Sequence, residues 1–175
     1  MEEIKRISRD LVAHGAIIDY YQDTMQIPNG HVARWDFIKH KGAAAVVPVD
    51  DQGRIIMVRQ YRNALERYTL EIPAGGLQTA EEPTRDAAAR ELQEETGYYS
   101  DDLELLLSIY TTVAFCNEKI DIYLAKNLKP GRQHLDEAYP VEELMNKIFR
   151  CEIQDSKTVA AILAYNEYRR KQEHN

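Results

Sequence analysis

Three glutamates, Glu91, Glu94 and Glu95, follow Arg90 closely in a stretch whose alanines and leucine predict a helix. At 3.6 residues per turn, their side chains fall within an arc of roughly 100°. Like charges so close on a helix repel one another, unless a cation neutralises them. Mg²⁺ prefers oxygen ligands and commonly bridges carboxylates to substrate phosphates. The spacing therefore predicts a metal site, or else a solvated acidic face on which Arg90 is an i,i+4 partner of Glu94 or Asp86.

The helix that must position these carboxylates is expected between Pro83 and Gly97. Proline is favoured in the first turn of a helix, and glycine is a common C-terminal stop. Ala88 and Leu92 occupy the arc beside the glutamates, and this apolar arc would pack on a sheet. The acidic arc is therefore expected at the edge of a buried surface.

The rest of the sequence predicts one α+β chain. Residues 10–40 carry β-formers and turn signals, and the apolar runs on either side of Asp50–Gly53 predict a hairpin. A strand is expected to end at Pro73, and further strands are expected at about 103–110 and 119–125. Two helices, over 140–149 and 155–172, close the chain, with Asp155 or Ser156 as the N-cap of the second.

Composition limits the function classes. The chain has 175 residues, which fits one domain, and a formal net charge of −7, which argues against a general nucleic-acid binder. No apolar run approaches the roughly 20 residues that cross a bilayer, and the charged N-terminus lacks the apolar core of a signal peptide. The two cysteines are too few for a disulfide framework. We expect a cytoplasmic protein with no membrane or nucleic-acid partner.

The segment from Gly76 to Tyr98 resembles the Nudix box. That pattern is a glycine, five residues, a glutamate, seven residues, Arg-Glu, an aliphatic residue, any residue, Glu-Glu, any residue, a glycine and an aliphatic residue. The glycines and charged positions all match, and Tyr98 is aromatic where an aliphatic residue is usual. The resemblance implies a Nudix fold, an α/β/α sandwich around a mixed β-sheet. It would comprise a hydrolase domain at 41–175 and a small N-terminal antiparallel β element at 1–40, which helps to form a dimer in relatives.

The same resemblance assigns roles to the residues of the box. It implies a metal site for Mg²⁺, with Mn²⁺ as a substitute, whose ligands would be the Gly75 carbonyl and the carboxylates of Glu91, Glu94 and Glu95. Glu94 would be either a ligand or a group that positions water. Arg90 would orient the carboxylates by charge-assisted hydrogen bonds. Glu82 would support them from the start of the helix, where an acid also favours the helix dipole.

Sequence outside the box resembles the ADP-ribose pyrophosphatase branch, from about residue 15 to 170. This implies hydrolysis of the pyrophosphate bond of ADP-ribose, giving AMP and ribose 5-phosphate, or of a related nucleotide sugar. Arg59 and Arg62 would reach the diphosphate or a ribose, unless they are surface strand residues. Trp35 matches a position at which relatives stack an aromatic ring on adenine, although a lone Trp is also a common core residue.

Glu118 takes the place of the family's loop glutamate, which activates the water or binds a further metal; the alternative is a solvated loop residue. Val113 stands where ADP-ribose enzymes typically have proline, so a hydrolase of GDP-mannose or ADP-glucose is an open alternative. A regulator that binds ADP-ribose without cleaving it is a third reading, which the complete box disfavours. By resemblance alone, the chain is expected to be a homodimer.

Overall fold

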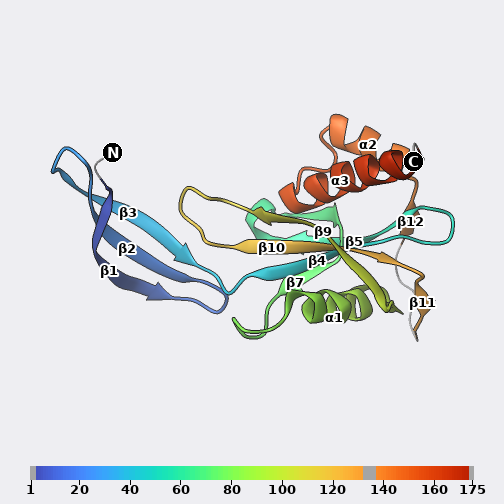
Figure 1. Cartoon of the computed structure of the whole chain (residues 1–175), viewed down its shortest axis with the longest axis horizontal. Coiled ribbons are helices and arrows are strands. Elements are labelled where there is room, and N and C mark those ends of the chain that lie inside the picture. The colour runs from blue at the N-terminus through green and yellow to red at the C-terminus, as the bar shows by residue number, and fades with distance from the viewer. Residues whose placement is uncertain (1–2, 132–136, 174–175) are drawn as a thin grey trace. The chain divides into compact units, whose positions relative to one another are not determined.

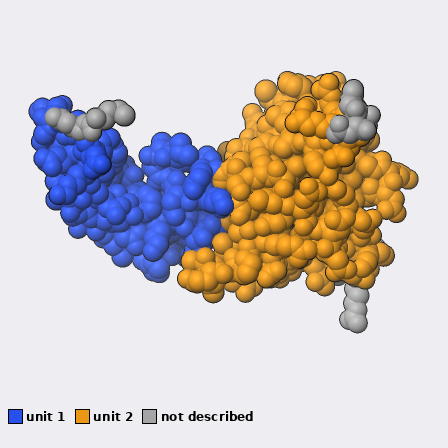
Figure 2. All heavy atoms as spheres, in the orientation of Figure 1, with its two compact units in different colours: residues 1–42, 110–119 blue, residues 43–109, 120–175 orange. Residues whose placement is uncertain are grey.

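The computed structural model (Figure 1) describes residues 3–131 and 137–173 of the chain. The chain divides into two compact units (Figure 2). Unit 1 comprises residues 1–42 and 110–119, and unit 2 comprises residues 43–109 and 120–175. The N-terminal element was expected at residues 1–40. Unit 1 also contains residues 110–119, a segment from much later in the sequence. No helix in the described part of the chain is long and apolar enough to span a membrane.

Unit 1 contains an antiparallel sheet in the order β1-β2-β3. Its strands are β1 (Lys5–His14), β2 (Asp19–Gln26) and β3 (Val32–Lys39). The sheet has a charged centre: Arg9 donates to both carboxylate oxygens of buried Asp23, at 2.7 and 2.6 Å. The same guanidinium lies 3.6 Å from the ring centre of Phe37. Apolar side chains of β1 such as Ile7 and Leu11 are exposed.

The central sheet of unit 2 has the order β7-β4-β10-β9. Its strands are β4 (Ala43–Pro48), β7 (Ala74–Gly76), β9 (Asp102–Tyr110) and β10 (Lys119–Lys126). β10 runs parallel to β4 and β7 runs antiparallel to it, so the sheet is mixed. A second sheet has the order β12-β5-β6, from β5 (Ile55–Arg62), β6 (Arg67–Glu71) and β12 (Glu137–Tyr139). β8 (Tyr98–Tyr99) pairs with β11 (Lys129–Pro130), and a 3₁₀ turn, η1 (Asn63–Leu65), joins β5 to β6.

Helices cover both faces of the central sheet (Figure 1). They are α1 (Thr84–Thr96) on one side and α2 (Val141–Phe149) with α3 (Ser156–Glu173) on the other. Alternate side chains of a strand point to opposite faces, so Ala44 and Val46 of β4 pack with Leu92 of α1. Ala45 and Val47 join the core under α2 and α3. The predicted α/β/α sandwich around a mixed sheet is therefore confirmed.

The prediction of a hairpin around Asp50–Gly53 is correct for the turn but wrong for the strands, which do not pair with each other along their length. The turn is present, since Gly53 N–H donates to Asp50 O at 2.9 Å, and a single antiparallel bridge joins Val49 to Ile55. The strands then part, because β4 joins β7 and β10 while β5 joins β6 and β12. All of β4 and the first four residues of β5 are buried. Each strand therefore needs packing neighbours on both of its faces, and its own sheet provides the strands beside it.

The ends of the helices follow the local sequence closely. Gly97 ends α1 with a φ of 73°, the left-handed conformation that glycine adopts without strain, which confirms the predicted stop. Pro83 occupies the N-cap position of α1, one residue before the helix begins. Asp155 caps α3, because Thr158 N–H donates to its carboxylate at 3.0 Å. The first of the two predicted caps is thus confirmed.

A buried ion network ties β5 and β6 to the start of α3. Glu71 is 1% exposed and accepts hydrogen bonds from Arg62, Lys157 and Thr69. Lys157 also donates to Asp155 at 2.8 Å. Burial by itself would raise the pKa of Glu71, but these hydrogen bonds overcome it and lower the pKa to about 2. The network therefore stabilises the folded chain only while Glu71 is ionised.

We predict that Glu71→Gln lowers the free energy of unfolding at pH 7 by about 3–5 kcal/mol, because two cations lose their buried partner. The pKa of Glu71 is lower in the folded chain than its ordinary value of 4.5. Its stabilisation is therefore complete above about pH 4.5 and is lost as the pH falls toward about 2.

Urea unfolding measured between pH 7 and pH 2.5 checks this prediction. The variant should lose less stability than the parent over the acid range. Glu104→Gln is the matched control, since Glu104 is half-exposed and its partners are Lys126 and the Tyr168 hydroxyl. A parent and a Glu71→Gln variant with the same pH slope would contradict the assignment.

Candidate functional site

Arg90 of α1 lies among the acidic residues of the box. Its Nη1 donates to Glu91 and lies 3.4 Å from a carboxylate oxygen of Glu94. Its Nε and Nη2 each lie 3.4 Å from Glu82, and Nη2 donates to the carbonyl of Gly76 at 3.3 Å. One guanidinium therefore links three carboxylates to the last residue of β7, a geometry that suits the predicted orienting role.

The carboxylate of Glu91 is buried against bare backbone. Glu91 is 7% exposed, and a Cβ added to Gly75 would overlap its carboxylate carbon and both carboxylate oxygens. Gly75 lies in β7, the edge strand of the central sheet, opposite Ala44. Only glycine lets the Glu91 carboxylate lie so close to the backbone of residue 75. The Glu91 oxygens therefore lie next to Gly75, whose carbonyl was predicted to be a metal ligand.

Glu95 is held from two sides. Its Oε2 accepts from Ala74 N–H at 3.0 Å, and its Oε1 accepts from the Gln60 side-chain amide at 2.6 Å. Burial raises the pKa of Glu95, the Ala74 N–H opposes the shift, and the neighbouring charge of Glu91 raises the pKa further. Gln60 was missed from the sequence, although it stands between the two arginines of interest in the segment "RQYR".

The remaining acids of the box differ in exposure. The Glu94 side chain is 59% exposed, which suits a group that reaches water or substrate. Glu82 accepts from Gln78 N–H at 2.6 Å and so braces the loop before α1. The structure therefore separates an inner pair, Glu91 and Glu95, from an outer carboxylate, Glu94.

These residues fit a divalent cation. The donors are carboxylate and carbonyl oxygens, as Mg²⁺ requires, and the bare backbone at Gly75 leaves room for close approach. In the described part of the chain, no three His, Cys, Asp or Glu side chains are already gathered as a ligand set. Arg90 contacts one carboxylate oxygen of Glu91 and one of Glu94, so the second oxygen of each lies outside its contacts.

Arg59 and Arg62 do not share a face of β5, because they are three residues apart on a strand. Arg62 donates to Glu71 from Nε at 2.7 Å and from Nη2. Its side chain is 43% exposed, so it is both anchored and accessible. Arg59 faces the side of Leu70, its register partner in β6.

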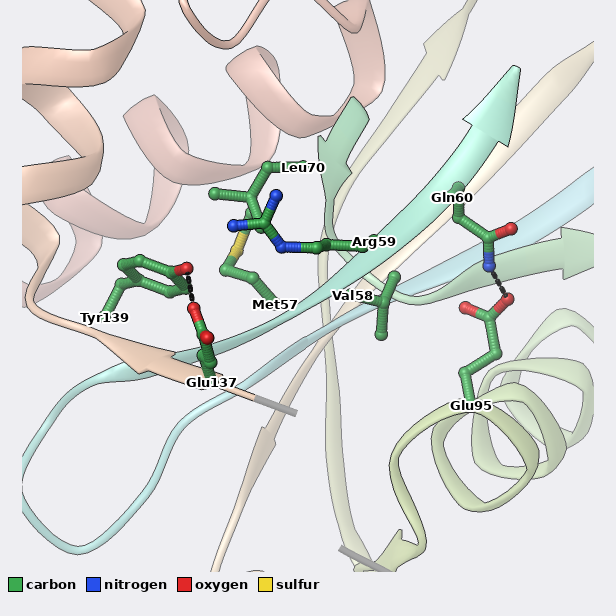
Figure 3. A pocket seen from close by; sticks show the side chains of 8 residues that line it. All are labelled: Met57, Val58, Arg59, Gln60, Leu70, Glu95, Glu137 and Tyr139. Carbon is green, nitrogen blue, oxygen red and sulfur yellow. Dashed lines mark hydrogen bonds between the residues drawn. The ribbon is translucent and has the colours of Figure 1, made fainter. Parts of the chain in front are cut away.

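Arg59 lines a pocket of about 330 Å³ in unit 2 (Figure 3). Figure 3 shows Gln60 meeting Glu95 at one end and Tyr139 meeting Glu137 at the other. The lining side chains come from the second sheet and α1: Met57, Val58, Arg59, Gln60, Leu70, Glu95, Glu137 and Tyr139. The pocket therefore reaches a predicted metal ligand and mixes apolar walls with hydrogen-bonding groups.

Glu118 and Trp35 belong to unit 1. Glu118 accepts from the Thr111 hydroxyl at 2.8 Å, and its other oxygen lies 3.6 Å from His40 Nδ1. Trp35 is 45% exposed on β3, opposite Asp23 of β2, so it is not a core residue. Neither Thr111 nor His40 was singled out from the sequence, and only the structure brings them to Glu118.

A family model described as NUDIX domain matches residues 39–161. ADP-ribose pyrophosphatase of Bacillus subtilis (strain 168) is 38% identical, over 91% of each chain. Methanol dehydrogenase activator of Bacillus methanolicus is 37% identical, again over 91% of each chain. The crystal structure of an ADP compounds hydrolase has a TM-score of 0.86 and covers 98% of this chain and 97% of its own. At 21% identity, that likeness shows the fold alone.

We predict that Gly75→Ala lowers the free energy of unfolding by about 1–3 kcal/mol, because its Cβ collides with Glu91. In a Glu91→Ala background the same change should cost little, since the colliding carboxylate is gone. A Glu94→Ala background is the control and should leave the cost unchanged, because Glu94 is exposed. Thermal unfolding of the variants measures these costs, and equal costs in both backgrounds would disprove the packing described.

Proposed function

The chain belongs to the Nudix family and is a hydrolase of the ADP-ribose pyrophosphatase type, and we propose that it splits the pyrophosphate bond of ADP-ribose or a related nucleoside diphosphate sugar with the help of Mg²⁺. From ADP-ribose the products would be AMP and ribose 5-phosphate. The observation that carries the proposal is the burial of the Glu91 carboxylate against Gly75, with Glu95 beside it. This packing prepares oxygens for a cation that a chain of net charge −7 needs to hold an anionic substrate.

In this proposal, Gly75, Glu91, Glu94 and Glu95 hold Mg²⁺, and Mn²⁺ would replace it. When bound there, the cation would supply positive charge to the pyrophosphate. Arg90 orients the carboxylates through the contacts described above.

The chain's own groups bind the substrate and move the proton. Arg62 donates to a diphosphate oxygen with the N–H groups that Glu71 leaves free. Glu118 takes a proton from the attacking water, whose oxygen bonds to one phosphorus while that phosphorus loses its bond to the bridging oxygen. No covalent enzyme intermediate is needed.

The pocket along β5 is the proposed place for the sugar half of the substrate. It adjoins Glu95, and its hydrogen-bonding groups, Arg59, Glu137 and Tyr139, suit hydroxyl-rich ligands. ADP-ribose, ADP-glucose and GDP-mannose all fit this description, and the exposed Val113 leaves the choice among them open.

A second candidate function is regulation by binding without cleavage. The relative named methanol dehydrogenase activator favours it, because its identity and coverage nearly equal those of the pyrophosphatase. The complete set of box carboxylates favours hydrolysis.

We predict Mg²⁺-dependent release of a nucleoside monophosphate from at least one of these three compounds. Glu95→Gln should lower kcat by about a hundredfold, because ligand loss is at least as costly as loss of a supporting group. Glu104→Gln is the control and should match the parent. Product analysis by chromatography provides the measurement. A Glu95→Gln rate within about tenfold of the parent would sink the metal assignment, and binding without products would favour the regulator.

Trp35 is the proposed adenine-stacking residue, since its ring is exposed on β3. Stacking on a base is worth about 1–3 kcal/mol, so Trp35→Ala should raise KM by about tenfold or more and leave kcat nearly unchanged. Steady-state kinetics with ADP-ribose tests this, with Phe149→Ala as the control for loss of an exposed aromatic residue. An unchanged KM would remove Trp35 from the binding site.

We also propose a homodimer formed through β1, whose side chains Ile7 and Leu11 are each 55% exposed on an edge strand. Ile7→Glu should then shift the mass measured by light scattering from dimer to monomer, whereas Lys5→Glu on the same strand should not. A monomeric parent would refute the dimer. The cytoplasmic location stays a prediction.

A further inference from the structure

The loop that carries Glu118 is fastened to strand β3 within unit 1. Ile38 N–H donates to Phe115 O at 2.7 Å, and Asn117 N–H donates back to Ile38 O at 3.3 Å. The Asn117 side chain then continues this pairing past the end of the strand: His40 N–H donates to its Oδ1 at 2.8 Å, and its Nδ2 donates to His40 O at 3.1 Å. One side chain thus bonds both polar backbone groups of His40.

This clamp lies next to the groups that hold the Glu118 carboxylate. Thr111 N–H donates to Glu118 O at 3.2 Å, which closes the loop, and the Thr111 hydroxyl fixes one carboxylate oxygen. Gly42 N–H donates to His40 Nδ1 at 3.0 Å, so Nδ1 carries no proton in this arrangement. The His40 ring therefore packs beside Glu118 Oε1 without donating to it from Nδ1.

We propose that Asn117 is a positioning residue for Glu118: by bonding both backbone groups of His40 it fixes the Thr111–Glu118 loop on β3. The proposal rests on the proposed function, in which Glu118 takes the proton of the attacking water. A small displacement of a catalytic group costs rate, and a shift of 1 Å can cost about a hundredfold. Trp35 stands on the same strand, so the clamp joins the strand of the predicted adenine contact to the loop of the predicted base.

Asn117→Ala removes both bonds to His40 and should lower kcat by about tenfold or more, with KM for ADP-ribose changed by less than about twofold. Asn117→Asp keeps the acceptor for His40 N–H and loses the donor, so it should fall between the parent and Asn117→Ala. Asn29→Ala is the matched control. Asn29 also accepts a backbone N–H in unit 1, from His31 at 3.1 Å, but in the turn between β2 and β3.

The decisive measurement is Asn117→Ala in a Glu118→Gln background. If Asn117 acts through Glu118, the residual rate should change by less than about twofold. An equal loss in both backgrounds, or no loss of kcat in Asn117→Ala alone, would overturn the proposal.

Amide hydrogen exchange gives a readout without turnover. The amides of Phe115, Cys116 and Asn117 should exchange faster in Asn117→Ala than in the parent, and Asn29→Ala should leave them unchanged. A parent without hydrolase activity would refute the proposed function, and exchange would still decide on the clamp. Unaltered exchange of the loop amides in Asn117→Ala would refute the clamp whatever the activity.

Discussion

The carboxylates of Glu91, Glu94 and Glu95 on helix α1 repel one another. The groups of unit 2 around them must offset this repulsion for the helix to pack on the sheet. Glu91 and Glu95 lie one turn apart, and after burial the charge of Glu91 is a further cause that raises the pKa of Glu95. The Arg90 guanidinium donates a hydrogen bond to Glu91. The Ala74 N–H and the Gln60 side-chain amide donate hydrogen bonds to Glu95. The cluster is therefore held by one cation and two neutral donors, and the proposed Mg²⁺ would add positive charge to it.

The partners of each buried carboxylate also distinguish Glu71, which stabilises the fold, from Glu95 of the candidate site. Burial acts to raise the pKa of both Glu71 and Glu95, but Glu71 is bonded to two cations, Arg62 and Lys157, so its pKa falls to about 2. The pKa of Glu95 rises instead. Two carboxylates of one unit thus have opposite environments. Glu71 fastens α3 to the second sheet, whereas Glu95 accepts hydrogen bonds from two neutral groups, the Gln60 amide and the Ala74 N–H. Arg62 connects the two, because it is anchored by Glu71 and still partly exposed.

The sequence predicted most of what depends on local contacts. Gly97 and Asp155 end and begin helices through bonds to residues three or four positions away, and the helical arc of the glutamates follows from periodicity alone. The separation of β4 from β5 could not be predicted in this way, since continuous apolar runs fit either a hairpin or two sheets. Strand parity would have placed Arg59 and Arg62 on opposite faces. The role of Gln60 could not be predicted from the sequence, because its hydrogen bond to Glu95 joins residues thirty-five positions apart.

The predicted catalytic residues depend on neighbours that no motif contains. Glu118 stands in a loop of unit 1 whose shape is set by β3, through contacts that span seventy-seven residues between His40 and Asn117. A pattern of fixed spacing describes one continuous segment, so it finds the carboxylates of α1 but cannot find the strand that supports a distant loop. The residues that hold Glu118, among them Thr111 and Asn117, could therefore be found only from the structure, because they lie outside the box.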